Sequence, residues 1–259
     1  MSAAIILWSK HMRKLRVHPE EAVGLLIQPI LWVVLFGLGM KGLLGTTFAG
    51  GGDAYITFMV PGIVALTALG GAIGGGLVWL NERVQGIAKE YLVAPIPRIS
   101  ILVGNALSVV TKTMFQAIVL IIVGVLMGAQ ISNEPAGWVG GLVLIAGYGM
   151  GFAGVALAFA SKTNDPGSYH MLIFLVNLPL LFMSNALYPL AALPTWMEVV
   201  ARINPTSYVV DGMRQMIFDS GAAASGSVEL SLWLCFVVVG AFAVFGMMLA
   251  YVVFRRSIR

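Results

Sequence analysis

The chain of 259 residues is 59% hydrophobic and only 10% charged, whereas soluble domains are roughly 25% charged, which argues against a soluble globular fold. The formal net charge of +4 comes from basic residues beside apolar segments and not from an extended basic patch, so it indicates membrane orientation rather than nucleic-acid binding. Several apolar segments reach the ~20 residues that a helix needs to cross a bilayer. They lack the alternation of barrel strands, so an all-α multi-pass membrane protein is expected.

Residues 2–20 are predicted to form an amphipathic helix that lies in the membrane interface. Apolar residues such as Ile5 and Trp8 alternate with Lys10, Arg13, Lys14 and Arg16. A solvated positive tail is the alternative. The apolar residues precede the basic cluster, which is the reverse of a signal peptide, so we expect the first span to remain in the mature protein.

Six membrane spans are predicted. We place them at Ala22–Leu44, Tyr55–Leu80, Leu107–Gly128, Gly137–Ala160, Tyr169–Tyr188 and Leu230–Phe254. The second span carries glycines four residues apart, Gly70 with Gly74 and Gly71 with Gly75, a spacing that lets helix backbones approach closely in lipid. A bending point in that span is the alternative use of the glycines.

An even number of spans places both termini on one side of the membrane. All of the fifteen Lys and Arg residues except Lys41, Arg202 and Arg214 lie on that side. Because positive residues are retained in the cytoplasm, both termini are predicted to be cytoplasmic. Lys112, near the start of the third span, is expected to extend its side chain to the cytoplasmic surface.

The segment Asn81–Asn105 is the long polar interruption in the first half of the chain. Glu82, Arg83, Lys89 and Glu90 precede a Pro-x-Pro break at Pro95 and Pro97, and Arg98 follows. A charged segment between two spans is a surface loop that a soluble partner can bind. A merely solvated loop is the alternative.

The region 189–227 is too polar to cross the bilayer whole. Two short amphipathic helices are predicted there, one from Leu193 to Ala201 and one that starts at Asn204. We expect them to dip into the outer leaflet and return. An exposed loop is the alternative, although Trp196 and Met213 would be unusual in one.

Catalytic and nucleotide-binding patterns are missing from the sequence. It has no GxxxxGK[ST] phosphate loop and no HExxH zinc motif, and Cys235 is its single cysteine. Intramembrane carboxylates, which ion-driven carriers usually need, are almost absent from the predicted spans. The chain is therefore not expected to be an enzyme, and energy for transport must come from another chain.

Two motif regions resemble the type-2 ABC exporter permeases, a family that includes daunorubicin-resistance and nodulation-factor export permeases. The first is Lys89–Leu107, where Glu90, Leu92, Pro95 and Arg98 stand in the family's order after Gly86. Pro97 and Asn105 depart from the usual serine and lysine. The second is Ser184–Arg214, which matches at Tyr188, Pro189, Leu193, Pro194, Trp196, Asn204, Pro205, Tyr208, Asp211 and Arg214.

The resemblance implies a single permease domain over residues 1–259, located in the cytoplasmic (inner) membrane. Two copies would each work with a separate ATPase subunit that carries ATP and Mg, with no cofactor or metal on this chain. The loop 81–98 would form a coupling helix that contacts the ATPase through Glu82, Arg83, Lys89, Glu90, Pro95 and Arg98. The family's substrate route, between the two copies and lined by spans two and five, would include Phe174, Leu178, Phe182 and Met183.

The expected substrate is a hydrophobic or amphipathic drug, lipid or glycolipid that is exported from the cytoplasm. Polysaccharide export is the second alternative within the same family. An ion-coupled secondary carrier, or an intramembrane enzyme or assembly factor, remains the alternative from another class. Co-purification with an ATPase distinguishes the permease from both.

Overall fold

The computed structural model describes residues 3–44, 51–93, 97–190, 193–218 and 230–257. Within these ranges the chain is almost entirely helical, and the one β-bridge joins Ile131 to Phe218. The helices are α1 (Ala3–Val17), α2 (Pro19–Leu44), α3 (Gly51–Val84), α4 (Ala88–Val93), α5 (Arg98–Leu126), α6 (Pro135–Lys162), α7 (Pro166–Phe182), α8 (Thr195–Ile203), α9 (Pro205–Met216) and α10 (Leu232–Ser257).

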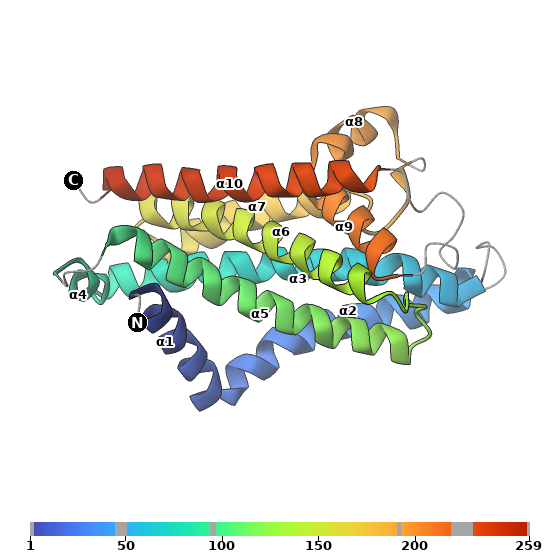
Figure 1. Cartoon of the computed structure of the whole chain (residues 1–259), viewed down its shortest axis with the longest axis horizontal. Helices are drawn as coiled ribbons and strands as arrows, with labels where there is room; N and C mark the ends of the chain where they lie inside the picture. The colour runs from blue at the N-terminus through green and yellow to red at the C-terminus, as the bar shows by residue number, and fades with distance from the viewer. Residues whose placement is uncertain (1–2, 45–50, 94–96, 191–192, 219–229, 258–259) are drawn as a thin grey trace.

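Five of these helices, α2, α3, α5, α6 and α10, are long and apolar enough to cross a membrane. They run along the long axis of the bundle together with α7 (Figure 1). Helix α7 has 17 residues, or ~25 Å at 1.5 Å per residue, against a hydrocarbon core of ~30 Å. The predicted fifth span, Tyr169–Tyr188, is thus only partly helical: the chain leaves the helix after Phe182, and Ser184, Asn185 and Ala186 continue inward as buried irregular backbone.

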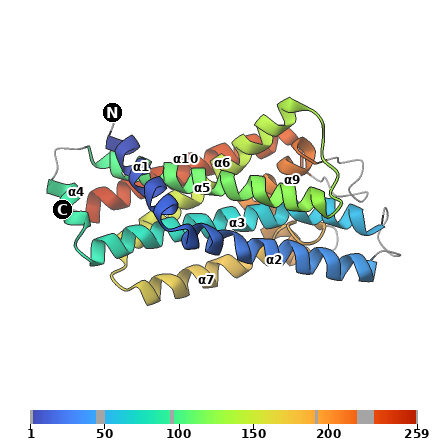
Figure 2. The same ribbon diagram turned by 90° about the horizontal axis from the view of Figure 1, so that it is seen from below.

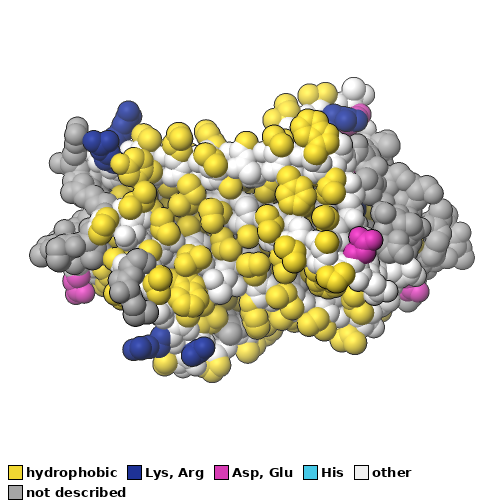
Figure 3. Space-filling model, in the orientation of Figure 1, with side chains coloured by type: hydrophobic (Ala, Val, Ile, Leu, Met, Phe, Trp, Pro, Cys, Tyr) yellow, Lys and Arg dark blue, Asp and Glu magenta, His cyan; other side chains and the backbone are white. Residues whose placement is uncertain are grey.

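Apolar side chains cover the middle of the bundle, and charged side chains lie toward its ends on the face shown in Figure 3. Helix α1, helix α4 and the last turn of α10 gather at one end in both ribbon views (Figures 1 and 2). The short helices α8 and α9 lie toward the other end. We refer to the end of the bundle that holds α1, α4 and the last turn of α10 as the α4 end.

Helix α3 is the central helix of the bundle. It packs against α2, α5, α6, α7 and α9, and Gly70 is its one exposed residue between Ala54 and Leu80. Most of its surface is therefore used inside the subunit, and only a narrow strip of α3 is left for the substrate route that the family resemblance implies.

The predicted loop Asn81–Asn105 is shorter in the structure than the sequence indicates. Helix α3 continues to Val84, and α5 already begins at Arg98, directly after Pro97. Asn105 is buried inside α5, where its amide nitrogen donates a hydrogen bond to the Gly75 carbonyl at 3.3 Å. The membrane helices thus extend past their apolar segments, because a polar side chain at a helix end can pair with a neighbouring helix.

Helix α9 is buried in the bundle rather than dipping into lipid as the sequence predicts. It packs on α6, α10 and α3, and Val209, Met213 and Ile217 belong to the core. The Tyr148 and Thr206 hydroxyls hydrogen-bond at 2.9 Å and join α6 to α9. Burying the amphipathic helix in protein satisfies polar groups that lipid would leave unpaired.

A buried charge pair fixes α9. Arg214, 1% exposed, lies over the Phe58 ring, with 3.8 Å between the guanidinium carbon and the ring centroid, and donates to the Phe58 and Asn185 carbonyls. Asp211 accepts from the Asn185 amide and the Leu230 backbone N–H and lies 3.6 Å from Arg214. Removing one member of such a pair leaves the other charge buried and unpaired.

Helices α6 and α10 meet through glycines. A Cβ at Gly154 would lie 2.2 Å from the Gly246 carbonyl carbon, whereas a Cβ at Gly240, also on α10, would meet nothing within 4 Å. Because lipid supplies no hydrophobic driving force between helices, such close contact stabilises the bundle by packing.

We therefore expect Gly154→Ala to separate α6 from α10 and to destabilise the protein by about 1–3 kcal/mol through overpacking. Samples of the detergent-solubilised chain are heated to a series of temperatures, and the folded peak that remains in size-exclusion chromatography gives the melting temperature. Gly240→Ala is the matched control and should melt like the unchanged chain. Equal melting of both variants would show that the contact does not hold the two helices.

Candidate functional site

The α4 end carries a cluster that joins three helices. The Lys10 ammonium of α1 donates to Glu82 Oε1 of α3 at 2.7 Å and also to the Tyr91 hydroxyl of α4. The Tyr91 hydroxyl lies 3.3 Å from the same Glu82 oxygen. We call Lys10, Glu82 and Tyr91 the three-helix cluster. It connects the short helix α4 to the interfacial helix and to the central helix.

Hydrogen bonds set the charge state of this cluster. Burial alone would lower the pKa of Lys10. The hydrogen bonds to Glu82 and Tyr91 and the charge of Glu82 together outweigh this effect, so the pKa is raised above its ordinary value. Burial also raises the pKa of the Tyr91 hydroxyl. Since the folded state raises the pKa of Lys10, the stabilisation is complete below the unfolded-state value of ~10.4 and is lost only as pH rises through the folded-state value. The cluster is thus intact at neutral pH.

Arg83 ties α3 to the end of α6. Its guanidinium donates to the carbonyl oxygens of Ser161 and Thr163 and, at 2.8 Å, to Asn164 Oδ1. The last carbonyls of a helix lack partners within the helix and carry partial negative charge. The Arg83 guanidinium therefore caps the C-terminus of α6 and holds the α6–α7 turn against α3.

A tight turn leads from α3 into α4. Gly86 has φ +82°, a left-handed conformation that glycine adopts without the steric cost of a Cβ. The turn directs Ala88–Val93 back toward α3, with Ala88 buried and Glu90 exposed. This explains why a glycine stands ahead of the charged motif.

The six residues predicted to contact an ATPase fall into three groups. Glu82 and Arg83 are bound inside the chain as described, and Glu90 is exposed at α4. Pro95 lies outside the described residues. Lys89 and Arg98 lie in α4 and at the start of α5, and their side chains are likewise outside the description. Glu90 is therefore the member with a described side chain that is open to a partner.

Sequence reasoning missed the roles of Lys10 and Tyr91. The sequence indicates only that Lys10 is one of four basic residues in an interfacial helix, and Tyr91 lies inside the Lys89–Leu107 motif with no predicted role. The available signal was the aromatic residue next to Glu90, because a hydroxyl on so short a helix needs a partner. The contact between them spans 81 residues of sequence, so no local pattern reports it.

The predicted substrate-path residues lie on an exposed apolar face of α7. Phe174 is 66% exposed, Leu178 and Phe182 are also exposed, and Met183, which caps the helix, is half-buried. Leu175 shares the exposure. Such a face contacts either lipid or another protein surface.

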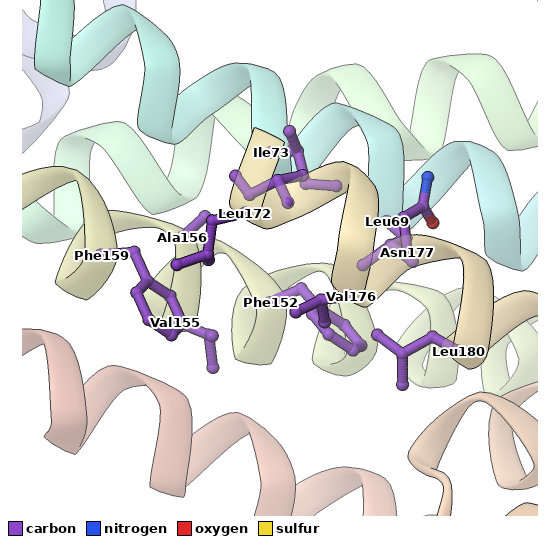
Figure 4. A pocket seen from close by; sticks show the side chains of 11 residues that line it. Leu69, Ile73, Phe152, Val155, Ala156, Phe159, Leu172, Val176, Asn177 and Leu180 are labelled. Carbon is purple, nitrogen blue, oxygen red and sulfur yellow. The ribbon is translucent and has the colours of Figure 1, made fainter. Parts of the chain in front are cut away.

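A small apolar hollow lies behind α7, between α7, α3 and α6 (Figure 4). Its volume is about 40 Å³, and Leu69, Phe152 and Leu180 are among its lining residues. Drug-sized ligands need roughly 300 Å³ or more. The hollow is therefore a packing gap within the subunit, and the outer face of α7 is the better candidate surface for substrate.

Comparison with known proteins identifies the architecture. Residues 2–218 match the ABC-2 type transporter family. The chain is 32% identical over 219 residues to ycf38 of Porphyra purpurea, described as a transport permease, covering 83% of this chain and 74% of the relative. The chain belongs to the ABC-2 type transporter family.

This permease is also similar to the daunorubicin resistance ABC transporter permease protein DrrB1 of Streptomyces coeruleorubidus, at 23% identity over 92% of this chain and 81% of the relative. It is 24% identical to the inner membrane transport permease YadH of Escherichia coli K12, over 80% of each chain.

Members of this family are membrane permease subunits that work with an ATPase partner in ABC transporters. The expected family resemblance is thereby confirmed, as is the multi-pass helical character of the permease. In the ABC-2 permease, the α4 end combines the three-helix cluster with the exposed acidic residue Glu90 on a short helix.

Glu82→Gln should loosen α1 because it removes the charge that holds Lys10. We expect amide hydrogen exchange in α1 to become several-fold faster, which corresponds to less than about 1 kcal/mol for a partly exposed ion pair. Glu90→Gln is the control because the Glu90 side chain is exposed. Unchanged exchange in the Glu82 variant would contradict the assignment of the three-helix cluster.

Proposed function

We propose that this permease is the membrane-spanning subunit of an ATP-driven exporter in the cytoplasmic membrane. Two copies work with two separate ATPase subunits, which carry ATP and Mg and perform the hydrolysis. The observation that supports this is the construction of the α4 end. A short helix with an exposed acidic residue is held there by hydrogen bonds to the interfacial and central helices.

The coupling route starts at α4, which acts as the coupling helix. The ATPase pushes on α4 through Glu90, with Lys89, Pro95 and Arg98 as further contacts. The three-helix cluster passes the displacement to α1 and α3, and Arg83 passes it from α3 to the end of α6. Because the helices are closely packed, they move as bodies rather than deforming individually.

The orientation follows from charge. The basic residues of α1 and the pair Arg255 and Arg256 in the last turn of α10 lie at the α4 end. The positive-inside tendency supports a cytoplasmic location for this end, and we propose that both termini lie there. Six crossings result if α7 completes its passage with the buried segment after Phe182.

The substrate is a hydrophobic or amphipathic compound that moves between two permease copies. The exposed face of α7, with Phe174, Leu178, Phe182 and Met183, is assigned to this route. Supporting this, the face is apolar and the hollow behind it is too small for cargo. One relative's name also refers to resistance to daunorubicin.

The coupling role of α4 predicts that Glu90→Lys uncouples the ATPase. Because the side chain is exposed, the substitution should change folding stability by no more than about 0.5 kcal/mol. We expect at least a severalfold loss of a P-loop ATPase that co-purifies with the tagged permease in mild detergent, and a parallel loss of vanadate-sensitive ATP hydrolysis.

Glu134→Lys is the matched control for that experiment. Glu134 is an exposed acid that precedes α6 at the opposite end of the bundle, so its reversal should leave ATPase recovery unchanged. Unchanged recovery and hydrolysis with Glu90→Lys would refute the assignment of α4.

The assignment of α7 to the dimer predicts cross-linking between copies. In a Cys235→Ala background, Leu175→Cys should form an intermolecular disulfide in oxidised membranes. Phe245→Cys on α10 is similarly exposed and serves as the control that should cross-link little. The readout is the dimer band on a non-reducing gel, and equal yields from both positions would contradict an α7 interface.

A further inference from the structure

A second cavity lies at the angle between α1 and α2, which form an open V in Figure 1. It has a volume of about 280 Å³ and is lined from α1, α2, α3 and α5. The hollow behind α7 is apolar, but this cavity carries His11, Lys14, Glu21 and Lys112. It is separate from the proposed route along α7.

The charges of the cavity do not balance. Lys14 forms an ion pair with Glu21, and burial lowers the pKa of His11, which favours its neutral form. Lys112 is half-buried in α5, and within the described residues it has no hydrogen-bond or ion-pair partner. That Lys112 extends to the cytoplasmic surface stays a prediction, and the structure adds that its side chain lines this cavity.

Polar side chains with unused hydrogen-bonding capacity line the same cavity. Asn105 and Gln116 are 4% and 3% exposed, and their amide nitrogens donate to the carbonyls of Gly75 and Leu25. These bonds fix the amide orientation and leave both side-chain oxygens without a partner. Unpaired buried polar atoms are costly, so a ligand or water that pairs with them is favoured.

The walls keep the cavity open. Gly71, Gly74 and Gly75 of α3 form one side, and a Cβ at Gly74 would meet nothing within 4 Å. Helix α1 closes another side through the hydrogen bond from Trp8 Nε1 to Thr111 Oγ1 of α5, at 3.0 Å. The cavity is lined on α2 by Gly24 and Leu25, which follow Val23 in sequence. Val23, Ile27 and Leu31 are exposed apolar residues, so α2 offers a surface suited to lipid next to the cavity.

We propose that this cavity binds the anionic headgroup of a membrane amphiphile, such as a phosphodiester lipid of the inner leaflet. Lys112 pairs with the anion. Hydroxyl groups of the headgroup donate to the unpaired amide oxygens of Asn105 and Gln116, and the acyl chains lie outside along the apolar surface of α2. A zwitterionic headgroup fits less well because its cation adds positive charge to a cavity in which Lys14 and Lys112 already outnumber Glu21.

The test measures the melting temperature of the detergent-solubilised full chain, with its ATPase where that co-purifies. The probes are dioleoylphosphatidylglycerol, dioleoylphosphatidylcholine and sodium phosphate. We expect phosphatidylglycerol to raise the melting temperature by about 5 °C through preferential binding to the folded state. Phosphatidylcholine and phosphate should each give less than half of that shift.

Two variants locate the effect. Lys112→Gln removes the charge, and Gly74→Leu fills the cavity while Lys112 is retained; both should reduce the phosphatidylglycerol shift by at least half. Lys162→Gln, an exposed basic residue at the same end, and Gly70→Leu, one turn away on α3 with open space at its Cβ, should keep the full shift.

A full shift in the Gly74→Leu variant would overturn the proposal, even if Lys112→Gln fails to fold. A full shift from phosphate alone would also overturn it, because the cavity would then take a soluble anion rather than an amphiphile. Neither outcome bears on α4 or on the ATPase, so the two proposals fail separately.

Discussion

Close contact between helix backbones is the constraint on which this structure depends. Because lipid is as apolar as the helix surfaces, the hydrophobic effect does not drive helices together inside the membrane. Packing and buried hydrogen bonds must therefore hold the bundle together. Gly154 and Gly246 let α6 and α10 approach, and Gly62 meets the Ala186 carbonyl. The buried Asp211–Arg214 pair then fixes α9 beside α3. A bundle made rigid in this way can transmit a displacement from one end to the other.

The polar contacts at the α4 end connect the short helix α4 to this rigid bundle. Glu82 and Arg83 are neighbours in sequence, yet one holds α1 and α4 while the other holds α6. Two adjacent residues at the end of the central helix thus connect four helices. In the proposed mechanism, the ATPase needs only to displace α4, because the contacts of Glu82 and Arg83 pass the displacement on to α1, α3 and α6.

The sequence predicted the helical membrane class, the family and the place of the polar interruption, since these depend on apolar length and local motifs. It did not predict that α5 begins at Arg98, because Asn105 is polar and its pairing with Gly75 is invisible locally. It likewise missed the burial of α9, whose amphipathic pattern suits an interface and a protein interior equally well. No sequence pattern indicates that Lys112 lines a cavity, because that cavity depends on how α1 and α2 diverge. Such long-range contacts are a property of the fold.

The central claim is that α4 meets an ATPase, and site-specific photo-cross-linking tests it most directly. A photoreactive amino acid would replace Glu90 in the tagged permease, and Glu134 in a matched sample, in membranes of the native host. The account predicts a light-dependent adduct between the Glu90 position and a P-loop ATPase, and none from the Glu134 position. Adducts to lipid alone, or equal ATPase adducts from both positions, would contradict it.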